Sequence, residues 1–262
     1  MSDIKIFQIL YASILGLMMG SFLSMLIPRL HKEEKGIVFG RSHCSTCGHK
    51  LSILNLIPFF SYIFQGGKCS FCKKNIPLFY IAIEIFTVLT FLLITITENN
   101  FGAYDFHHEE WLGKFLLFSV LIFIFFYDLL YKEIHDIILI PGIILALIYG
   151  YFSDQGLEAS LLGGLLGALF FLSQYLISKG KWIGSGDIRI GIFMGLILGI
   201  KLTVLALIIS YILGSIVGIF LLATKKADKK TSIPLGPFLV IGTMISYFAG
   251  LEIIDWYMNL MI

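Results

Sequence analysis

The sequence predicts an all-α polytopic membrane protein with about eight transmembrane helices and a small cytoplasmic domain between the first two. Of its 262 residues, 58% are hydrophobic and 14% are charged, and the mean hydropathy is +0.91. Soluble globular domains have a smaller apolar share and more charge. The net charge of +2 and the scattered basic residues argue against a nucleic-acid partner. We expect membrane lipid to surround the protein.

The first predicted span is the uncharged run of residues 6–28, which is long enough to cross a bilayer. A signal peptide is the alternative, but no small-residue cleavage site follows the run. Arg29 and Lys32 follow instead and act as a stop. Gly16 and Gly20 are four residues apart on this helix, a spacing that allows close packing against a neighbour.

Residues 31–77 form a polar loop rich in Lys and Arg, which is typical of the cytoplasmic side. Two CxxC pairs in this loop hold all the cysteines of the chain, Cys44, Cys47, Cys69 and Cys72. Four thiolates in this pattern suit a tetrahedral Zn²⁺ site, and two disulfides, the alternative, are disfavoured in a reducing compartment. His43 and His49 are alternative ligands, although four thiolates already complete the coordination shell. We expect the metal to keep this small domain folded.

The second span, residues 78–97, contains one acid, Glu84. An acid within a membrane span is either satisfied by a neighbouring group or belongs to a functional site, and the sequence leaves both open. The loop after this span is acidic and contains no Lys or Arg, as an external loop would. The chain therefore divides into a first helix (1–30), a zinc-binding domain (31–77) and a larger membrane domain (78–262).

The third span, residues 111–127, ends at Asp128. Because this acid follows an unbroken uncharged run, we place it at the membrane boundary on the cytoplasmic side. Asp136 follows in the next turn, where it either supports a site or caps the helix that begins there.

Five more spans are predicted, at residues 137–152, 159–178, 187–200, 202–224 and 235–251. Lysines follow two of them and mark the cytoplasmic side, Lys179, Lys181, Lys225, Lys226, Lys229 and Lys230. Both termini are then external, and Asp187 lies on the same side as Asp128.

The span that begins at Asp187 is too short for a normal bilayer. Either the bilayer thins there or this acid is drawn below the surface into the protein. Gly191, Gly195 and Gly199 form a stripe that would let another helix approach closely.

Asp187 ends the sequence Gly184-Ser185-Gly186-Asp187, in which glycines free the carboxylate from ordinary helix geometry. Carboxylates at membrane depth are costly and usually face a water-filled cavity. Two acids in one site share a proton, so that one can activate water while the other protonates a scissile carbonyl. This scheme is peptide hydrolysis without a metal. A proton or cation relay in a transporter is the alternative.

Motifs along nearly the whole chain, in order, resemble those of the bacterial type IV prepilin peptidases. They comprise Gly20–Leu23, Arg41–Lys50, Asn55–Pro58, Ser61, Tyr62, Gly67–Cys69, Cys72, Glu84, Asp128, Ile134–Asp136, Gly184–Arg189 and Gly236–Phe238. Few unrelated families would combine them. One departure is His135, where the family commonly has proline, which loosens the turn after Asp128 without touching either acid.

The resemblance implies a bifunctional enzyme of the bacterial cytoplasmic membrane. It would cleave the short basic leader of pilin-like precursors after a glycine, and then methylate the new N-terminus with S-adenosylmethionine. Asp128 and Asp187 match the catalytic acids, and the four cysteines match the tetracysteine domain. We interpret four further residues as active-site support, Gly184, Gly186, Asp136 and Glu84. No glycine-rich nucleotide loop identifies the methyltransferase residues.

Two other functions stay open from the sequence. Another GxGD intramembrane protease, of the presenilin or signal-peptide-peptidase kind, would suit Tyr127-Asp128. Such proteases carry a Pro-Ala-Leu signature near the C-terminus and no tetracysteine domain, and neither feature fits this chain. A zinc-bearing membrane adaptor or transporter would use the acids only to relay charge.

Overall fold

The computed structural model describes residues 2–34, 40–44, 46–97, 108–153, 155–225 and 233–261. In these residues the protein is helical, with two isolated β-bridges and no strand. Among them, 6 helices are long and apolar enough to cross a membrane, α1 (Ser2–His31), α3 (Phe79–Thr97), α4 (His108–Tyr131), α6 (Gly156–Ser178), α7 (Ser185–Ala223) and α8 (Gly236–Met261). Helix α5 (Asp136–Phe152) is apolar but shorter. The prediction of an all-α, multi-pass membrane protein is confirmed.

The chain forms two compact units, Met1–Phe123 and Ile124–Ile262, and the boundary falls within α4. Two short elements, η1 (Ile53–Leu56) and α2 (Phe60–Phe64), lie between α1 and α3 in the sequence. The predicted basic residues Lys226, Lys229 and Lys230, and most of the acidic loop before Trp111, lie outside the described residues.

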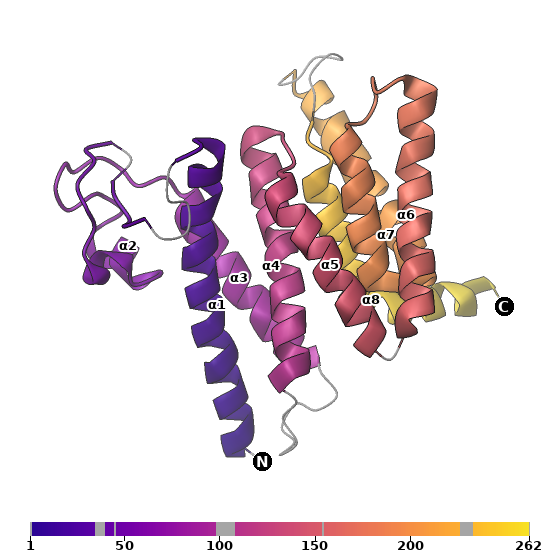
Figure 1. Cartoon of the computed structure of the whole chain (residues 1–262), viewed down its shortest axis with the longest axis horizontal. Helices are drawn as coiled ribbons and strands as arrows, with labels where there is room; N and C mark the ends of the chain where they lie inside the picture. The colour runs from indigo at the N-terminus through magenta and orange to yellow at the C-terminus, as the bar shows by residue number, and fades with distance from the viewer. Residues whose placement is uncertain are drawn as a thin grey trace. The chain divides into compact units, whose positions relative to one another are not determined.

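In the first unit, α1 and α3 lie side by side (Figure 1). A Cβ atom on Gly16 would lie 2.9 Å from the Cα of Val88, and one on Gly20 would lie 2.7 Å from the Cα of Glu84. Real side chains do not tolerate such distances, so glycine is required at both positions. The close packing predicted from their spacing is therefore present.

In the second unit, α6 and α7 pack through glycines on both helices. Gly191 and Gly195 of α7 face Gly167 and Gly163 of α6 so closely that an added Cβ would meet backbone atoms of the partner helix. This contact explains the glycine stripe after Asp187. It fixes the helix that carries this acid against α6.

Helix α7 covers the predicted span 187–200 and nearly all of the predicted span 202–224, and it breaks at Gly199 (φ 68°, ψ 180°), near the end of the first span. A break leaves the carbonyls of the preceding turn without their helical donors. The Gln155 side-chain amide donates to two of them, the carbonyls of Leu196 (3.3 Å) and Ile197 (3.2 Å). The left-handed φ of Gly199 and these hydrogen bonds from Gln155 together end the first arm of α7 (residues 185–198). The second arm (residues 200–223) begins after Gly199.

The second arm of α7 returns along α6. The Tyr211 hydroxyl donates to the Gln174 side chain over 2.8 Å, while Gly191 contacts Gly167. On one straight helix Gly191 and Tyr211 would be about 30 Å apart, whereas their partners on α6 are only about 10 Å apart. The chain therefore reverses at Gly199, from which Asp187 and Tyr211 are equally distant in the sequence.

This reversal determines which part of the second arm lies level with Asp187. The second arm is long enough to cross a bilayer, and Tyr211 lies near its middle. Asp187, on the first arm, lies about 18 Å from the turn, at a similar level. Asp187 is therefore buried within the protein, level with the middle of the second arm, and its depth in a bilayer stays a prediction.

Helix α8 runs antiparallel to the second arm of α7. Gly242 fits against Ala206 and Ser210 of that arm, and Gly250 fits against Leu202. Because these contacts fix α8 along its length, they also fix the position of its first residue, Gly236.

Candidate active site and metal centre

Asp128 lies in the last turn of α4 and is buried, with 6% of its surface exposed. Its carboxylate accepts a hydrogen bond from the backbone N–H of Gly236 over 2.8 Å. The first N–H groups of a helix have no acceptor within it, and Pro237 has no N–H at all. The N-terminus of α8 is thus satisfied by Asp128, and its dipole favours a negative charge there.

Asp187 lies in the first turn of α7 and is 8% exposed. Its carboxylate reaches back to the backbone N–H of Gly184 over 2.9 Å, which is the side-chain half of a capping box. A carboxylate offers about four acceptor positions, so this hydrogen bond leaves capacity for others. Capping and chemistry are therefore compatible in the same residue.

The fold brings Asp128 and Asp187 together within the second unit. The two carboxylates are close enough for their charges to repel each other. Each also accepts an N–H group at the start of a helix. The arrangement provides two buried carboxylates, each anchored by a different backbone amide.

Three glycines surround these acids and differ in how tightly they are packed. A Cβ on Gly236 would lie 2.5 Å from Asp128 Oδ2, and one on Gly186 would lie 2.5 Å from Ile134 Cδ1. A Cβ on Gly184 would meet only Asp187 Oδ2, at 3.6 Å, which is ordinary contact. The structure thus requires glycine at two of these positions and permits a side chain at the third.

Asp136 is the first residue of α5 and forms an ion pair with Arg189 of α7. Arg189 is two residues after Asp187, so this pair ties the turn after Asp128 to the helix that carries Asp187. Both side chains are partly exposed, 39% for Arg189 and 46% for Asp136. Sequence reasoning singled out Asp136 as support but gave Arg189 no role in the site.

Glu84 belongs to the first unit. Its carboxylate accepts the backbone N–H of Phe59 over 2.8 Å and lines a cavity of about 500 Å³. The predicted support residues therefore fall into two groups, with Gly184, Gly186 and Asp136 around the two aspartates and Glu84 in this cavity.

The four cysteines form the candidate metal centre. Their sulfur atoms all lie within 4.8 Å of one another, and those of Cys44 and Cys72 are 3.8 Å apart. Four sulfurs bound tetrahedrally at about 2.3 Å from Zn²⁺ would be roughly 3.8 Å apart. The cysteines are free thiols that fit a tetrahedral metal ion.

The two CxxC pairs share a pattern of backbone hydrogen bonds. In each, the first cysteine exchanges backbone hydrogen bonds across the turn, Cys44 with Gly48 and His49, and Cys69 with Lys73 and Lys74. A residue with positive φ follows each second cysteine, Gly48 (71°) and Lys73 (58°). These paired turns, which we call the two knuckles (residues 43–50 and 68–75), present the thiols to a common point.

Backbone amides in the first knuckle prepare its leading thiol for metal binding. The N–H groups of Cys47 and Thr46 lower the pKa of Cys44 to about 6. In the second knuckle the N–H groups of Cys72 and Phe71 likewise lower the pKa of Cys69. The thiolate is the metal-binding form of cysteine, so these amides favour metal binding by the first thiol of each knuckle.

The two histidines of the first knuckle are not part of the sulfur cluster. His49 packs on the ring of Phe71, with centroids 3.4 Å apart, and thereby joins one knuckle to the other. His43 lies 3.8 Å from the Glu34 carboxylate. Within the described residues, the candidate metal ligands are the four cysteines.

The fold and the two sites define a multi-pass membrane protein with a buried pair of acids and a separate four-thiol centre. Two family models match the chain, the "Bacterial Peptidase A24 N-terminal domain" at residues 14–97 and the "Type IV leader peptidase family" at residues 115–219. The chain belongs to the type IV leader peptidase family. Gly236 lies beyond the matched residues, although it contacts Asp128.

Curated relatives match almost the full length of the chain. The prepilin leader peptidase/N-methyltransferase of Pseudomonas aeruginosa is 30% identical, over 96% of this chain and 93% of the relative. The protein with the same name from Bacillus subtilis is 30% identical, over 94% of this chain and 96% of the relative. The protein with this name from Dichelobacter nodosus is 27% identical, over 94% of this chain and 93% of the relative. No solved structure showed significant similarity.

Proposed function

We propose that this protein cleaves the leader peptide of type IV prepilins or pilin-like precursors and N-methylates the new N-terminus. Membership of the type IV leader peptidase family and the names of its relatives support both activities. The observation that carries the proposal is the pair of buried acids, Asp128 and Asp187, within one compact unit.

In the proposed cleavage step the two carboxylates hold one proton between them, because two like charges in one site are unfavourable. The ionised acid takes a proton from a water molecule as the water attacks the scissile carbonyl. The protonated acid donates to the carbonyl oxygen, which gives a tetrahedral intermediate. Collapse of this intermediate, with protonation of the amine, releases the leader. This step requires no metal.

The amides of Gly236 and Gly184 hold the two acids during this reaction. Each binds one carboxylate oxygen from the start of a helix. Fixed donors of this kind need no rearrangement when charge moves between the acids and the substrate.

Substrate specificity follows from the depth of the site. A precursor whose apolar helix lies in the bilayer would carry its leader junction to the membrane boundary, near the two acids. The protein would span the cytoplasmic membrane of a bacterium. Its basic loops predict that the boundary with the two acids faces the cytoplasm. Acidic side chains or anionic lipid on that face would attract the basic leader.

We assign Zn²⁺ to the four cysteines. The sulfur separations support this assignment, and a structural role suits a closed set of four thiolates. The metal would join the two knuckles of a segment that has little core of its own. S-adenosylmethionine is the proposed methyl donor, since the relatives are named N-methyltransferases.

A processing assay with purified protein in detergent tests this function. A synthetic precursor containing leader, junction and the first part of the apolar helix is incubated with S-adenosylmethionine, and the products are identified by mass spectrometry. We expect a single cut at the leader junction and a mass gain of one methyl group on the new N-terminus. An uncut precursor would contradict the cleavage activity, and a cut but unmethylated product would contradict the methyltransferase activity.

A further inference from the structure

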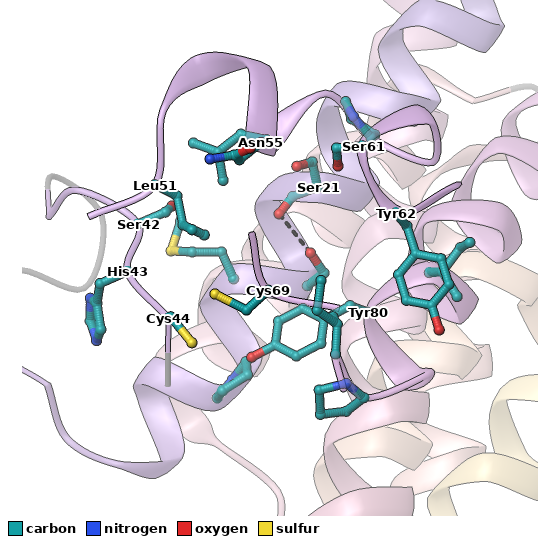
Figure 2. Close-up of a pocket in the computed structure, with 18 of the residues that line it drawn as sticks. Ser21, Ser42, His43, Cys44, Leu51, Asn55, Ser61, Tyr62, Cys69 and Tyr80 are labelled. Carbon is teal, nitrogen blue, oxygen red and sulfur yellow. Dashed lines mark hydrogen bonds between the residues drawn. The ribbon is translucent and has the colours of Figure 1, made fainter. Parts of the chain in front are cut away.

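The second unit contains an apolar groove of about 690 Å³ between α6 and the second arm of α7. Its walls are mostly leucine, isoleucine and valine side chains, from Leu162 to Phe170 on α6 and from Val204 to Tyr211 on α7. Charged side chains such as Glu84 line the cavity of the first unit, which Figure 2 shows, whereas no charged residue of the described chain lines this groove. The groove therefore suits an apolar occupant.

The groove begins at the level of Asp187. In the antiparallel register of α6 and the first arm of α7, Gly191 lies against Gly167. Asp187 is four residues before Gly191, so it lies level with Phe171, four residues after Gly167. Phe171 is next to the last groove residue of α6. From this level the groove extends along α6 for about 12 Å toward the turn at Gly199, which is the length of about two helical turns.

A hydrogen-bonded pair of side chains lies at this end of the groove. The Tyr211 hydroxyl donates to the side-chain carbonyl of Gln174 over 2.8 Å. The Tyr211 ring packs edge-on against Phe170, with centroids 5.7 Å apart, which holds the ring in place. Tyr211 is also close enough to Asp187 for the two side chains to interact electrostatically. The pair therefore lies beside the candidate active site.

The side-chain amide of Gln174 has donors that the protein does not use. Its carbonyl accepts the hydrogen bond from Tyr211, whereas its NH₂ group has no hydrogen-bond partner in the part of the chain that the structure describes. An amide donor in apolar surroundings is unfavourable unless an acceptor satisfies it. A peptide substrate supplies such acceptors, because the backbone carbonyls of an unwound segment have no helical donors.

We propose, on the basis of the cleavage activity proposed above, that Gln174 and the groove bind the precursor on opposite sides of the cleaved bond. Gln174 donates to the carbonyl of the peptide bond that precedes the cleaved one, and Tyr211 orients its amide. The first apolar residues after the cut lie in the groove. The occupant is thus the precursor chain itself, whose cleaved bond lies at Asp187.

The positions of the two parts fix the direction of the precursor. Gln174 is about one turn of α6 beyond the level of Asp187, and the groove lies on the other side of that level. The leader therefore leaves the site past Gln174, and the apolar segment runs toward Gly199. Because the groove is continuous with the active site through Tyr211, a chain held there is presented to the acids.

Cleavage kinetics with the full-length protein in detergent test the contact from Gln174. Gln174→Leu removes the amide and keeps a side chain of similar size, and Tyr211→Phe removes only the hydroxyl. Each variant is assayed with the precursor peptide and with a second substrate, in which an ester replaces the peptide bond before the cleaved one. An ester carbonyl is a weaker acceptor than an amide carbonyl. Ser173→Ala, which changes an exposed neighbour on α6, is the matched control.

We expect Gln174→Leu to raise KM for the peptide by about tenfold with little change in kcat, as loss of a uniform binding contact does. Tyr211→Phe should raise KM by a smaller factor, and Ser173→Ala should match wild type. With the ester substrate, the loss in Gln174→Leu should shrink to about twofold, because the contact is already weakened. An equal loss with both substrates, or a lower kcat at unchanged KM, would overturn the contact.

Photocross-linking tests the groove. A precursor peptide with a benzophenone side chain on the third residue after the cut is irradiated with the full-length protein in phospholipid vesicles. We expect the label on residues 162–170 or 204–211, and Leu166→Trp, which fills the groove, should reduce it about fivefold. The control is Leu161→Trp, an exposed leucine of α6 that does not line the groove. A label confined to lipid or to other helices would overturn the groove as the binding surface.

The wild-type result separates this proposal from the proposed function. If wild type cuts the precursor while the kinetic and cross-linking results contradict the contacts, the binding surface is wrong and the cleavage activity stands. If wild type does not cut the precursor, the cleavage activity and the binding surface are both wrong.

Discussion

The backbone N–H of Gly236 donates a hydrogen bond to the carboxylate of Asp128 over 2.8 Å, although the two residues are 108 positions apart in the sequence. Gly236 begins α8, so the N-terminus of this helix belongs to the candidate active site. A Cβ at this position would lie 2.5 Å from the carboxylate oxygen. The contact therefore requires glycine.

Gly236→Ala should lower the rate of precursor cleavage by about a hundredfold, because a shift of about 1 Å in a catalytic group has an effect of that order. Gly184→Ala is the matched control, since its Cβ would lie at an ordinary 3.6 Å from Asp187. We expect that control to keep most of its activity. Initial rates with one precursor peptide measure both, and equal rates for the two variants would argue against a role for Gly236.

Gly195→Ala should destabilise the second unit, because its new Cβ would overlap the backbone of Gly163. Overpacking of this kind costs about 1–3 kcal/mol, and here the obstacle is backbone that cannot rotate away. The control is Gly218→Ala, whose Cβ would meet only Ile233, at 3.8 Å. Thermal unfolding in detergent should show a lower Tm for the first variant alone. Equal Tm values would mean that α6 and α7 are not packed as described.

Asp136→Asn and Arg189→Gln should each lower cleavage by less than about tenfold, because a partly exposed ion pair contributes about 1 kcal/mol or less. The exchanged pair, Asp136→Arg with Arg189→Asp, should recover part of the loss if the pair positions the two helices. Cleavage rates of the single and double variants decide this. Complete loss in Asp136→Asn alone would instead place this acid among the catalytic groups.

Removal of the metal should destabilise the segment that carries the two knuckles and leave cleavage largely intact, because the two aspartates lie in the second unit. Cys44 and Cys69 belong to the metal centre and also line the cavity in the first unit. We expect wild type to contain one Zn²⁺ per chain by elemental analysis, and Cys44→Ser with Cys72→Ser to lose it. In detergent this variant should then unfold at a lower temperature than wild type and still cut the precursor. Wild-type protein purified without chelators and free of zinc would contradict the metal assignment.

The sequence was sufficient to single out the two acids and the four cysteines that the structure brings together. An acid at the end of a long apolar run is costly, so Asp128 and Asp187 stand out without any knowledge of the fold. The spacing of the cysteines is similarly distinctive, and the structure brings their sulfur atoms together. In both cases the signal is local, within a few residues.

The contacts that complete the sites are not local, and the sequence did not indicate them. A glycine before a proline is an ordinary start for a helix, so nothing marks Gly236 as a partner of Asp128. Glu84 could not be placed either, because its acceptor role depends on the unusual backbone of Phe59. Such pairings follow from tertiary packing and appear only in the three-dimensional structure.

The most direct measurement is cleavage of the precursor peptide by Asp128→Asn and Asp187→Asn, with donor binding measured on the same preparations. Asparagine keeps the shape of each side chain and its acceptor for the glycine amide, but it cannot exchange the catalytic proton. We expect both variants to lose cleavage and to bind S-adenosylmethionine as wild type does. Cleavage at the wild-type rate in either variant would show that the two acids are not the catalytic pair.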